Sequence, residues 1–244
     1  MRIDLARRSV AEAVGTALLL AAVVGSGIMG ERLANGNDAL ALLANTISTG
    51  AVLVALILAL GPISGAHFNP AVTIVDAWQQ GVAWADVPWL IAAQVLGAFT
   101  GVAGAHLMFG EPLFSMSQHL RSGGAQVFSE FVATFGLLSV IWGCARRRPA
   151  TTPFAVGAYI TSAYWFTAST SFANPAVTVA RAFSDTFAGI RLVDAPMFIV
   201  AQIAGAYAAT GLFQWLTPTL PAVADRVVMP HAVNPTERVA GEAP

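Results

Sequence analysis

The sequence contains no lysine and a single cysteine among its 244 residues, and charged residues make up only 10% of it. One thiol, Cys144, excludes a disulfide framework and a cysteine-based metal site within one chain. The net charge of −1 gives no support for nucleic-acid binding, which depends on clustered positive charge. Motifs of nucleophilic and metal-dependent enzymes, such as Gly-x-Ser-x-Gly and His-Glu-x-x-His, are absent as well. We therefore expect no enzyme activity, no cofactor and no bound metal.

Long apolar segments dominate what is present. Hydrophobic residues make up 56% of the chain, which is too apolar for a soluble domain of this length. Apolar runs close to the roughly 20 residues that a helix needs to span a bilayer recur along it. They predict an all-α membrane protein with six transmembrane helices, at about 10–30, 38–60, 85–109, 126–145, 152–169 and 195–216. The first run lacks a convincing cleavage site, which favours a transmembrane helix over a signal peptide.

The arginines between these runs predict the orientation, because basic loops stay in the cytoplasm. With six spans, both termini lie on one side of the membrane. The same side holds the larger set of arginines, which are Arg2, Arg7, Arg8, Arg146, Arg147, Arg148, Arg226 and Arg238. The other side holds Arg32, Arg121 and Arg191, with Arg181 near that mouth. Both termini are therefore predicted to be cytoplasmic, including a loose proline-containing tail at 217–244.

The tripeptide Asn-Pro-Ala occurs twice, as Asn69-Pro70-Ala71 and Asn174-Pro175-Ala176, and each copy continues Val-Thr. Asparagine is a good N-cap, and proline fits the first turn of a helix, where its missing N–H has no helical partner. Each copy therefore predicts a helix start. The surrounding stretches, 62–80 and 170–184, are too short and broken to span, so they are interpreted as re-entrant half-helices.

Other segments match in the same order along the chain. Residues 9–20 resemble 127–138, which aligns Glu12 with Glu130, and residues 94–101 resemble 202–211. These matches predict a repeat of three spans, about 9–109 and 125–216, within one domain that covers 1–216. Three spans per half reverse the direction of the second half, so the repeats are inverted and their shared site lies near the middle of the membrane.

The segments AEAVGT (11–16), SGAHFNPAVT (64–73) and ANPAVT (173–178), in this duplicated layout, resemble the aquaporin/aquaglyceroporin (major intrinsic protein) family. The resemblance covers the chain from about Val10 to Leu216. It implies a right-handed helical bundle, a homotetramer in the lipid bilayer, and one narrow pore per subunit. Such a pore passes water or small uncharged solutes passively.

In such a pore the two half-helix N-termini create a positive potential that opposes protons and other cations. The amides of Asn69 and Asn174 donate hydrogen bonds to a passing hydroxylated molecule. Acceptors along one wall are predicted to be the backbone carbonyls of the extended pieces, Gly65, Ala66 and His67 in the first half and Ser171, Phe172 and Ala173 in the second.

By spacing from the Asn-Pro-Ala units, the outer constriction of the family corresponds to Thr49, Ser162, Ser171 and Val177. Most relatives have arginine where Val177 stands, and many have a large aromatic or histidine where Thr49 and Ser162 stand. Loss of the arginine removes a fixed cation and its fork of donors. The ring is therefore predicted to be wide, polar and uncharged, and water-only selectivity is disfavoured.

A filter without arginine is similar to that of AqpS-like bacterial channels from arsenic-resistance operons, which lie in the inner membrane. This resemblance implies trivalent arsenic and antimony hydroxides as solutes besides glycerol and water, with methylated arsenicals as further candidates. A generic facilitator for glycerol, urea and polyols is the alternative. A water-selective channel and a proton-coupled transporter are less favoured.

Several residues keep two interpretations. Arg181 lies one turn beyond Val177, so it either partly replaces the missing cation or pairs with a loop or reaches the interface. Glu12 and Glu130 are buried carboxylates that either accept hydrogen bonds from the re-entrant loops, which is favoured, or relay protons. His67 either responds to pH or, as we favour, holds its loop in place.

Overall fold

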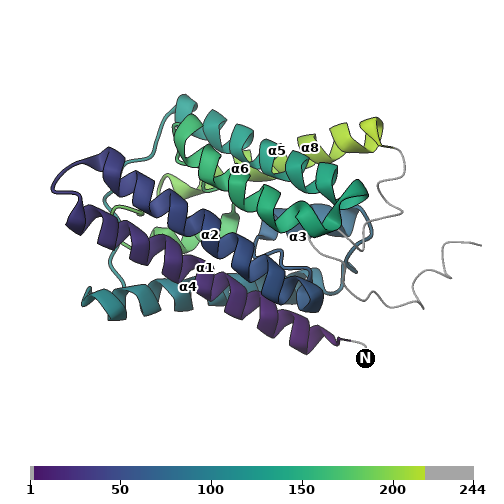
Figure 1. The fold of residues 1–244 in the computed structure, drawn as a ribbon, viewed down its shortest axis with the longest axis horizontal. Coiled ribbons are helices and arrows are strands. Elements are labelled where there is room, and N and C mark those ends of the chain that lie inside the picture. Colours follow the sequence, from purple (N-terminus) through teal and green to yellow (C-terminus); the bar gives the residue numbers. More distant parts are fainter. Residues whose placement is uncertain (1–2, 218–244) are drawn as a thin grey trace, which may run out of the picture.

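Six long helices form the body of the molecule. The computed structural model describes residues 3–217, with the backbone alone for 145–147. The long helices run side by side (Figure 1) and are α1 (Leu5–Leu33), α2 (Asp38–Ser64), α4 (Val87–Phe109), α5 (Gly124–Arg147), α6 (Thr152–Phe166) and α8 (Ala195–Leu216). Five of them are long and apolar enough to cross a membrane; α6, with 15 residues, is shorter. The start of α1 and the end of α8 lie at the same end of the bundle (Figure 1).

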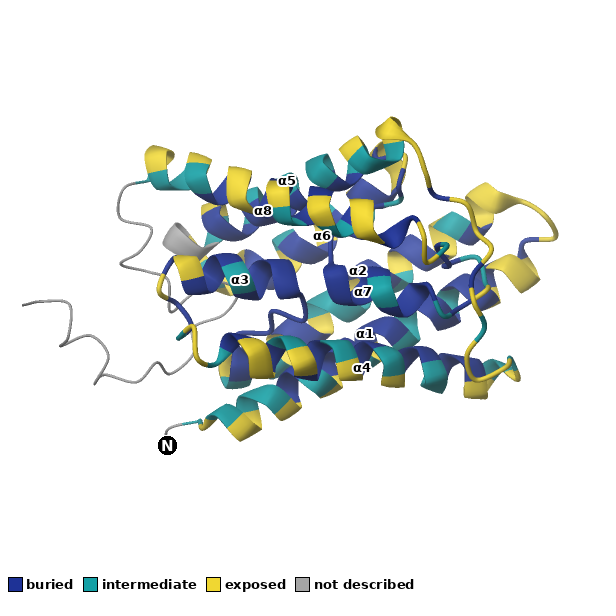
Figure 2. Ribbon diagram, turned by 180° about the vertical axis from the view of Figure 1, so that it is seen from behind, coloured by how far each residue is buried: buried dark blue, intermediate teal, exposed yellow. Residues whose placement is uncertain are grey.

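Two short helices, α3 (Pro70–Trp78) and α7 (Pro175–Arg181), lie among the long ones and are almost entirely buried (Figure 2). They have nine and seven residues, or about 13 and 10 Å at the rise of an α-helix. Each is shorter than half of the roughly 30 Å hydrocarbon core of a bilayer. The predicted fold of six spans and two half-helices is therefore confirmed. A single turn of 3₁₀-helix, η1 (Pro149–Thr151), precedes α6.

Some predicted boundaries differ from the structure. Helix α2 continues through Pro62 to Ser64, and the chain leaves it at Gly65, whose φ of 92° is left-handed and favours glycine. Helix α6 ends at Phe166, three residues before the predicted end. The predicted tail at 217–244 lies outside the described residues, apart from Thr217.

The inverted repeat is visible in how the helices pack. A Cβ on Gly97 of α4 would lie 2.2 Å from the carbonyl oxygen of Ala13 in α1. A Cβ on Gly205 of α8 would lie 2.5 Å from the carbonyl oxygen of Phe131 in α5. The sequence repeat aligns Ala13 with Phe131, so each half brings its first and third long helices together at an equivalent backbone contact.

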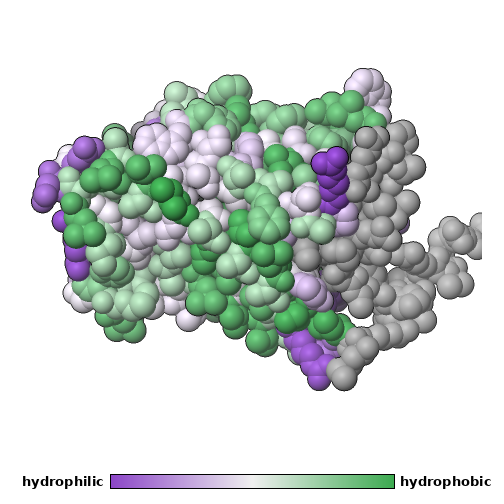
Figure 3. Space-filling model, in the orientation of Figure 1, coloured by the Kyte–Doolittle hydropathy of each residue, from purple (hydrophilic) through white to green (hydrophobic). Residues whose placement is uncertain are grey.

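The surface of the bundle fits a lipid environment. In Figure 3 the most hydrophilic residues lie toward the two ends, and the face between them is largely neutral to hydrophobic. Arg8 pairs with Asp86 at one end (2.9 Å), and Arg32 pairs with Glu111 at the other (2.7 Å). The polar ends and the apolar side match the orientation of a membrane-spanning bundle.

Candidate pore

The first re-entrant loop is held by Glu12, which is fully buried in α1. Its carboxylate accepts hydrogen bonds from the backbone N–H groups of His67 (3.0 Å) and Phe68 (2.6 Å). The side-chain amide of Gln94 donates to the same carboxylate (2.7 Å) and to the hydroxyl of Thr73 in α3 (2.9 Å). One acid thus ties the loop, the half-helix and α4 together.

Glu130 of α5 repeats this arrangement in the second half. Its carboxylate accepts from the backbone N–H groups of Phe172 (2.9 Å) and Ala173 (2.8 Å). Gln202 donates to it (2.6 Å) and to Thr178 in α7 (2.8 Å). Every oxygen of the two carboxylates accepts a loop N–H, which supports the structural interpretation of both acids rather than a proton relay.

The loops need this support because their backbone is unusual. Ala66, Phe68, Ser171 and Ala173 all have φ near 50°, in the left-handed region that non-glycine residues seldom adopt. In each half these are the residues three and one before the Asn-Pro-Ala unit. The predicted wall residues Ala66, His67, Ser171, Phe172 and Ala173 all line the central cavity, whereas Gly65 does not, because it forms the C-cap of α2.

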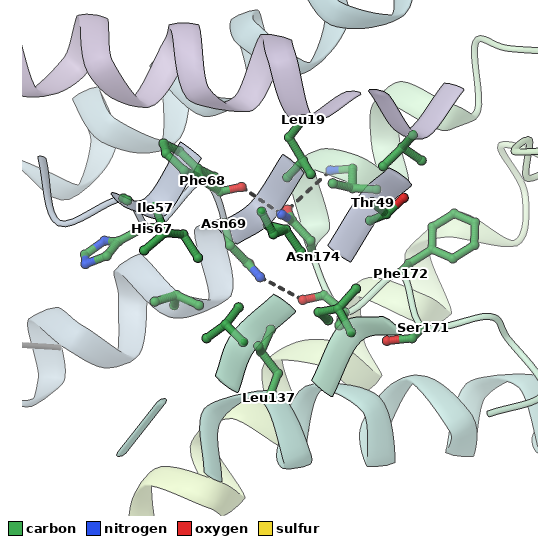
Figure 4. A pocket seen from close by; sticks show the side chains of 18 of the residues that line it. Leu19, Thr49, Ile57, His67, Phe68, Asn69, Leu137, Ser171, Phe172 and Asn174 are labelled. Atoms are coloured by element: carbon green, nitrogen blue, oxygen red, sulfur yellow. Dashed lines mark hydrogen bonds between the residues drawn. The ribbon is translucent and has the colours of Figure 1, made fainter. Parts of the chain in front are cut away.

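The two asparagines cap their half-helices and bind across the repeat. Each side-chain oxygen accepts from the backbone N–H two residues further on, at 2.9 Å for Asn69 and 3.0 Å for Asn174. The Asn69 amide donates to the carbonyl of Ala173 (2.8 Å), and the Asn174 amide donates to the carbonyl of Phe68 (2.7 Å), as Figure 4 shows. An amide has two N–H donors, so each asparagine keeps one for a solute.

A cavity of about 60 Å³ surrounds the asparagine pair. At about 10–15 Å³ for each water position, it holds about four to six waters. The close-up shows His67 on one side of the pair, and Thr49, Ser171 and Phe172 on the other (Figure 4). The wall opposite the polar loops is apolar and consists of Leu19, Val23, Leu53, Ile57, Leu137, Ile141, Val156 and Ile160.

Three of the four positions predicted for the outer ring, Thr49, Ser171 and Val177, line the cavity. The prediction for Ser162 is wrong, because this residue is exposed on the outside of α6. Tyr164 lines the cavity instead, with its hydroxyl 3.3 Å from that of Thr49. The reason is helical periodicity: Val156, Ile160 and Tyr164 recur every four residues on the face of α6 that lines the cavity.

The ring was predicted to be uncharged, but the cavity that it borders does contain a charged side chain. Arg181 is only 2% exposed and lines the same cavity. Its Nε donates to the carbonyl of Ala188, and its guanidinium carbon lies 3.4 Å from the centroid of the Phe172 ring. Arg181 therefore binds a loop and contributes a cation to the cavity at the same time, and it does not reach outward to the interface.

Arg121, in the loop between the two halves, was not identified as a site residue from the sequence. Its Nε donates to the carbonyl of Gly189 (2.8 Å), and a terminal nitrogen donates to that of Ser169 (3.1 Å). Its guanidinium carbon also lies over the Phe172 ring, 5.0 Å from the centroid. Burial lowers the pKa of Arg121 to about 10, so the side chain stays protonated at neutral pH. No local pattern marks this arginine.

His67 is tied to the first half-helix. Its Nδ1 lies 3.1 Å from the hydroxyl of Thr73, and its Nε2 lies 3.3 Å from a carboxylate oxygen of Asp76. Both the histidine and the aspartate are buried. This geometry supports the interpretation that the ring holds its loop, and it identifies Asp76 as a partner that the sequence alone did not suggest.

Comparisons with known proteins agree with this architecture. The family model described as "Major intrinsic protein" matches residues 1–167 and 150–243. Aquaglyceroporin AqpS of Rhizobium meliloti (strain 1021) is 56% identical over 213 residues, which are 87% of this chain and 91% of that protein. Probable aquaporin AqpM of Archaeoglobus fulgidus is 32% identical over 245 residues, covering 88% and 99%. The X-ray structure of the aquaglyceroporin from Plasmodium falciparum has the same fold, with a TM-score of 0.69 at 20% identity over 90% of this chain and all of that one.

Proposed function

Since the chain belongs to the major intrinsic protein family, a family of channels and not of enzymes, we propose that it passes small uncharged hydroxylated solutes across a membrane. Glycerol, water and trivalent arsenic or antimony hydroxides are the proposed solutes, and methylated arsenicals are further candidates. The observation that carries the proposal is the pair Asn69 and Asn174, each with a free amide donor facing a cavity whose opposite wall is apolar.

A hydroxylated solute entering this cavity loses water and needs replacement partners. The free N–H groups of the asparagine pair supply donors, and the hydroxyls of Thr49 and Ser171 supply both donors and acceptors. The aliphatic side chains of the opposite wall make no polar bonds, so the solute is not held tightly. Movement is passive, and concentration gradients set its direction.

Cations are opposed from two places. The N-termini of α3 and α7 meet at the asparagine pair, and each helix N-terminus carries a positive partial charge of about half a unit. Arg181 adds a full positive charge toward the outer ring. A proton or hydrated cation would meet both, whereas a neutral molecule would not be repelled.

The ring of Thr49, Tyr164, Ser171 and Val177 favours solutes that carry several hydroxyls. Three of its members offer a hydroxyl, and the fourth, Val177 in α7, places an apolar side chain there instead of a guanidinium group. Trivalent arsenic and antimony hydroxides resemble glycerol in shape and in their arrangement of hydroxyls. These solutes can therefore use the same donors and acceptors.

The proposal includes an inner-membrane location in a bacterium, with both termini in the cytoplasm, and assembly as a homotetramer with one pore per subunit. Residues 1–216 form the channel domain in this view. The apolar side of the bundle supports insertion in a bilayer, and the bacterial relative AqpS supports the compartment.

Side-by-side flux measurements in one reconstituted preparation test the function. Proteoliposomes are assayed for water, glycerol, urea and arsenite, with empty liposomes as the reference. We expect protein-dependent glycerol and arsenite flux. Fast water flux with both glycerol and arsenite excluded would refute the proposal, and glycerol flux without arsenite flux would establish the generic polyol facilitator instead. Uphill solute movement driven by a proton gradient would establish a transporter.

A further inference from the structure

In the described part of the chain, the side chains of two buried arginines near the predicted outer ring form no ion pair. Arg121 and Arg181 are 7% and 2% exposed. Within residues 3–217 the ion pairs of arginine involve Arg7, Arg8, Arg32 and Arg191, and none includes these two. Their side chains donate to neutral carbonyl and hydroxyl groups. The backbone N–H of Arg121 donates to the carboxylate of Asp194 (3.1 Å), but that carboxylate forms its ion pair with Arg191. Burying a charge without a counter-ion is unfavourable, so the two guanidinium groups leave positive charge in excess in this region.

The two positive charges are concentrated at one place. Both guanidinium groups lie over the ring of Phe172, with their central carbons 5.0 and 3.4 Å from its centroid. The ring face attracts each cation, but it does not neutralise either. The Nε of Arg181 donates to the carbonyl of Ala188, and its two terminal nitrogens make no hydrogen bond within the described chain. Arg181 also lines the cavity.

A second, independent feature points to a ligand at the same place. Ser171 is 3% exposed and lines the cavity, and its side-chain oxygen has no hydrogen-bond partner. Buried hydroxyls without a partner are uncommon. The hydroxyls of Thr49 and Tyr164, which lie 3.3 Å apart, border the same end of the cavity. A forked cation and several hydroxyls together suit the planar or tetrahedral oxygens of an anion.

We propose that the outer end of the pore cavity binds a small monovalent oxyanion between the terminal N–H groups of Arg181 and the hydroxyl of Ser171. Arg121 strengthens this binding through its charge. The inference rests on the proposed function, because the site lies on the path of the neutral solutes. A cavity of about 60 Å³ leaves no room for a second molecule beside the anion, so a bound oxyanion blocks glycerol.

Glycerol flux in the presence of methanesulfonate tests this site. Methanesulfonate is a small oxyanion that stays ionised at assay pH. Proteoliposomes contain equal concentrations on both sides, so that neither protein orientation nor osmotic imbalance matters. In the control, sodium gluconate replaces sodium methanesulfonate at the same ionic strength, because gluconate is too bulky for the cavity. We expect methanesulfonate to reduce protein-dependent glycerol flux severalfold at saturation, relative to gluconate.

Three variants identify the groups involved. Arg181→Gln removes charged hydrogen bonds and should raise the half-inhibitory concentration at least about tenfold. Ser171→Ala removes one neutral hydrogen bond and should raise it about three- to tenfold. The matched control is Arg32→Gln, an arginine that is half-exposed and away from the cavity, and it should be inhibited like the native protein. The proposal would be overturned if methanesulfonate inhibited Arg181→Gln as strongly as the native protein. It would also be overturned if methanesulfonate did not inhibit the native channel.

Direct binding separates this inference from the channel function. Saturation-transfer NMR on the methyl group of methanesulfonate, with detergent-solubilised protein, detects the anion whether or not glycerol passes. We expect a saturation-transfer signal with the native protein and a weaker signal with Ser171→Ala. This comparison tests the oxyanion site even if Arg181→Gln does not fold. A native channel with no glycerol flux but a clear signal would refute the proposed function alone. Glycerol flux without any signal would refute the oxyanion site alone.

Discussion

At the scale of single residues, the two buried carboxylates determine whether the pore loops keep their left-handed backbone. Glu130 accepts from two loop N–H groups, and an alanine in its place leaves both donors buried without a partner. Each such donor costs about 1–3 kcal/mol. We therefore expect Glu130→Ala to lower the free energy of unfolding by about 2–6 kcal/mol and to reduce the melting temperature in detergent. Glu31→Ala, at an exposed position of α1, is the control and should melt like the native protein.

The composition of the outer ring can be tested by comparing two neighbouring residues of α6. Tyr164 lines the cavity and Ser162 is exposed outside it. Removal of the phenol ring in Tyr164→Ala opens this end of the pore, so we expect faster flux of the longer polyols erythritol and xylitol in proteoliposomes. Ser162→Ala should leave all fluxes unchanged. The reverse pattern, an effect of Ser162→Ala alone, would mean that spacing from the Asn-Pro-Ala unit identifies the ring correctly.

These residues also show how far the sequence could predict the site. Ser171 and Val177 follow from the spacing of the second Asn-Pro-Ala unit, because its loop and half-helix adjoin it directly. Thr49 and Ser162 lie on long helices beyond an irregular loop, where spacing alone does not fix which helix face meets the pore; Thr49 lines the cavity and Ser162 does not. The four-residue periodicity that ends at Tyr164 was the available signal. Arg121 comes from a loop distant in sequence, and only tertiary packing brings it to Phe172.

At the scale of elements, glycines decide how closely α1 and α4 approach. A Cβ on Gly97 would lie 2.2 Å from the carbonyl oxygen of Ala13, whereas a Cβ on Gly104 of the same helix would meet nothing within 4 Å. We therefore expect Gly97→Ala to separate the helices and to destabilise the protein by about 1–3 kcal/mol, measured as thermal unfolding in detergent. Gly104→Ala makes the same chemical change in open space, and a loss of stability as large as that of Gly97→Ala would contradict this account.

The loop between the two halves contains a histidine whose charge state depends on its neighbours. Partial desolvation lowers the pKa of His119 below its usual 6.5, and the nearby Arg121 and Arg181 lower it further, against smaller opposing effects of Asp185 and Asp38. The folded protein thus binds this proton less readily than the unfolded chain. The stability that this difference confers is fully present above pH 6.5, the pKa of the unfolded chain, and is lost as the pH falls from there through the lower pKa of the folded protein.

We therefore expect the melting temperature to decrease from pH 7.5 to pH 5.5, and to decrease less in His119→Gln. The difference between the two decreases in melting temperature should be small, because His119 is exposed to solvent. Thermal unfolding of both proteins over this pH range measures it. An identical pH dependence in the variant and the native protein would show that His119 does not contribute.

The elements themselves were largely predictable. Long apolar runs and two N-capping asparagines each have a direct physical meaning, so six spans and two half-helices followed from them. Helix α2 ends at Ser64, four residues beyond the predicted span, within the stretch 62–80 that was predicted to be re-entrant. In the structure Pro62 lies in the last turn of the helix, and Gly65, with its left-handed backbone, ends it.

At the scale of the whole molecule, the repeat has the same geometry in both halves but carries opposite charges at one pair of equivalent positions. Residues two before and seven after each asparagine meet, as His67 with Asp76 in the first half and Phe172 with Arg181 in the second. Asp76 and Arg181 are therefore equivalent positions with opposite charges. The duplicated frame holds both half-helices in the same way, but Arg181 lines the cavity, whereas Asp76 is buried behind His67 and does not.

The assignment of inner and outer ends follows from the arginine distribution and can be tested by labelling. In a Cys144→Ser background, a cysteine is introduced either at Ser122, in the loop before α5, or at Ala85, in the loop before α4; both positions are exposed. These loops lie at opposite ends of the bundle, because a single long helix, α4, separates Ala85 from the loop that contains Ser122. A membrane-impermeant maleimide added to intact bacterial cells whose outer membrane admits it should label Ser122→Cys only.

After permeabilisation of the inner membrane, Ala85→Cys should be labelled as well, which confirms that this thiol is reactive. The expectation rests on the positive-inside rule, with Arg7 and Arg8 on the same side as Ala85. If Ala85→Cys were labelled in intact cells and Ser122→Cys were protected, the orientation in the membrane would be the reverse of the one predicted. The Arg181 end of the cavity would then face the cytoplasm, and an oxyanion bound there would block the channel from the inside of the cell.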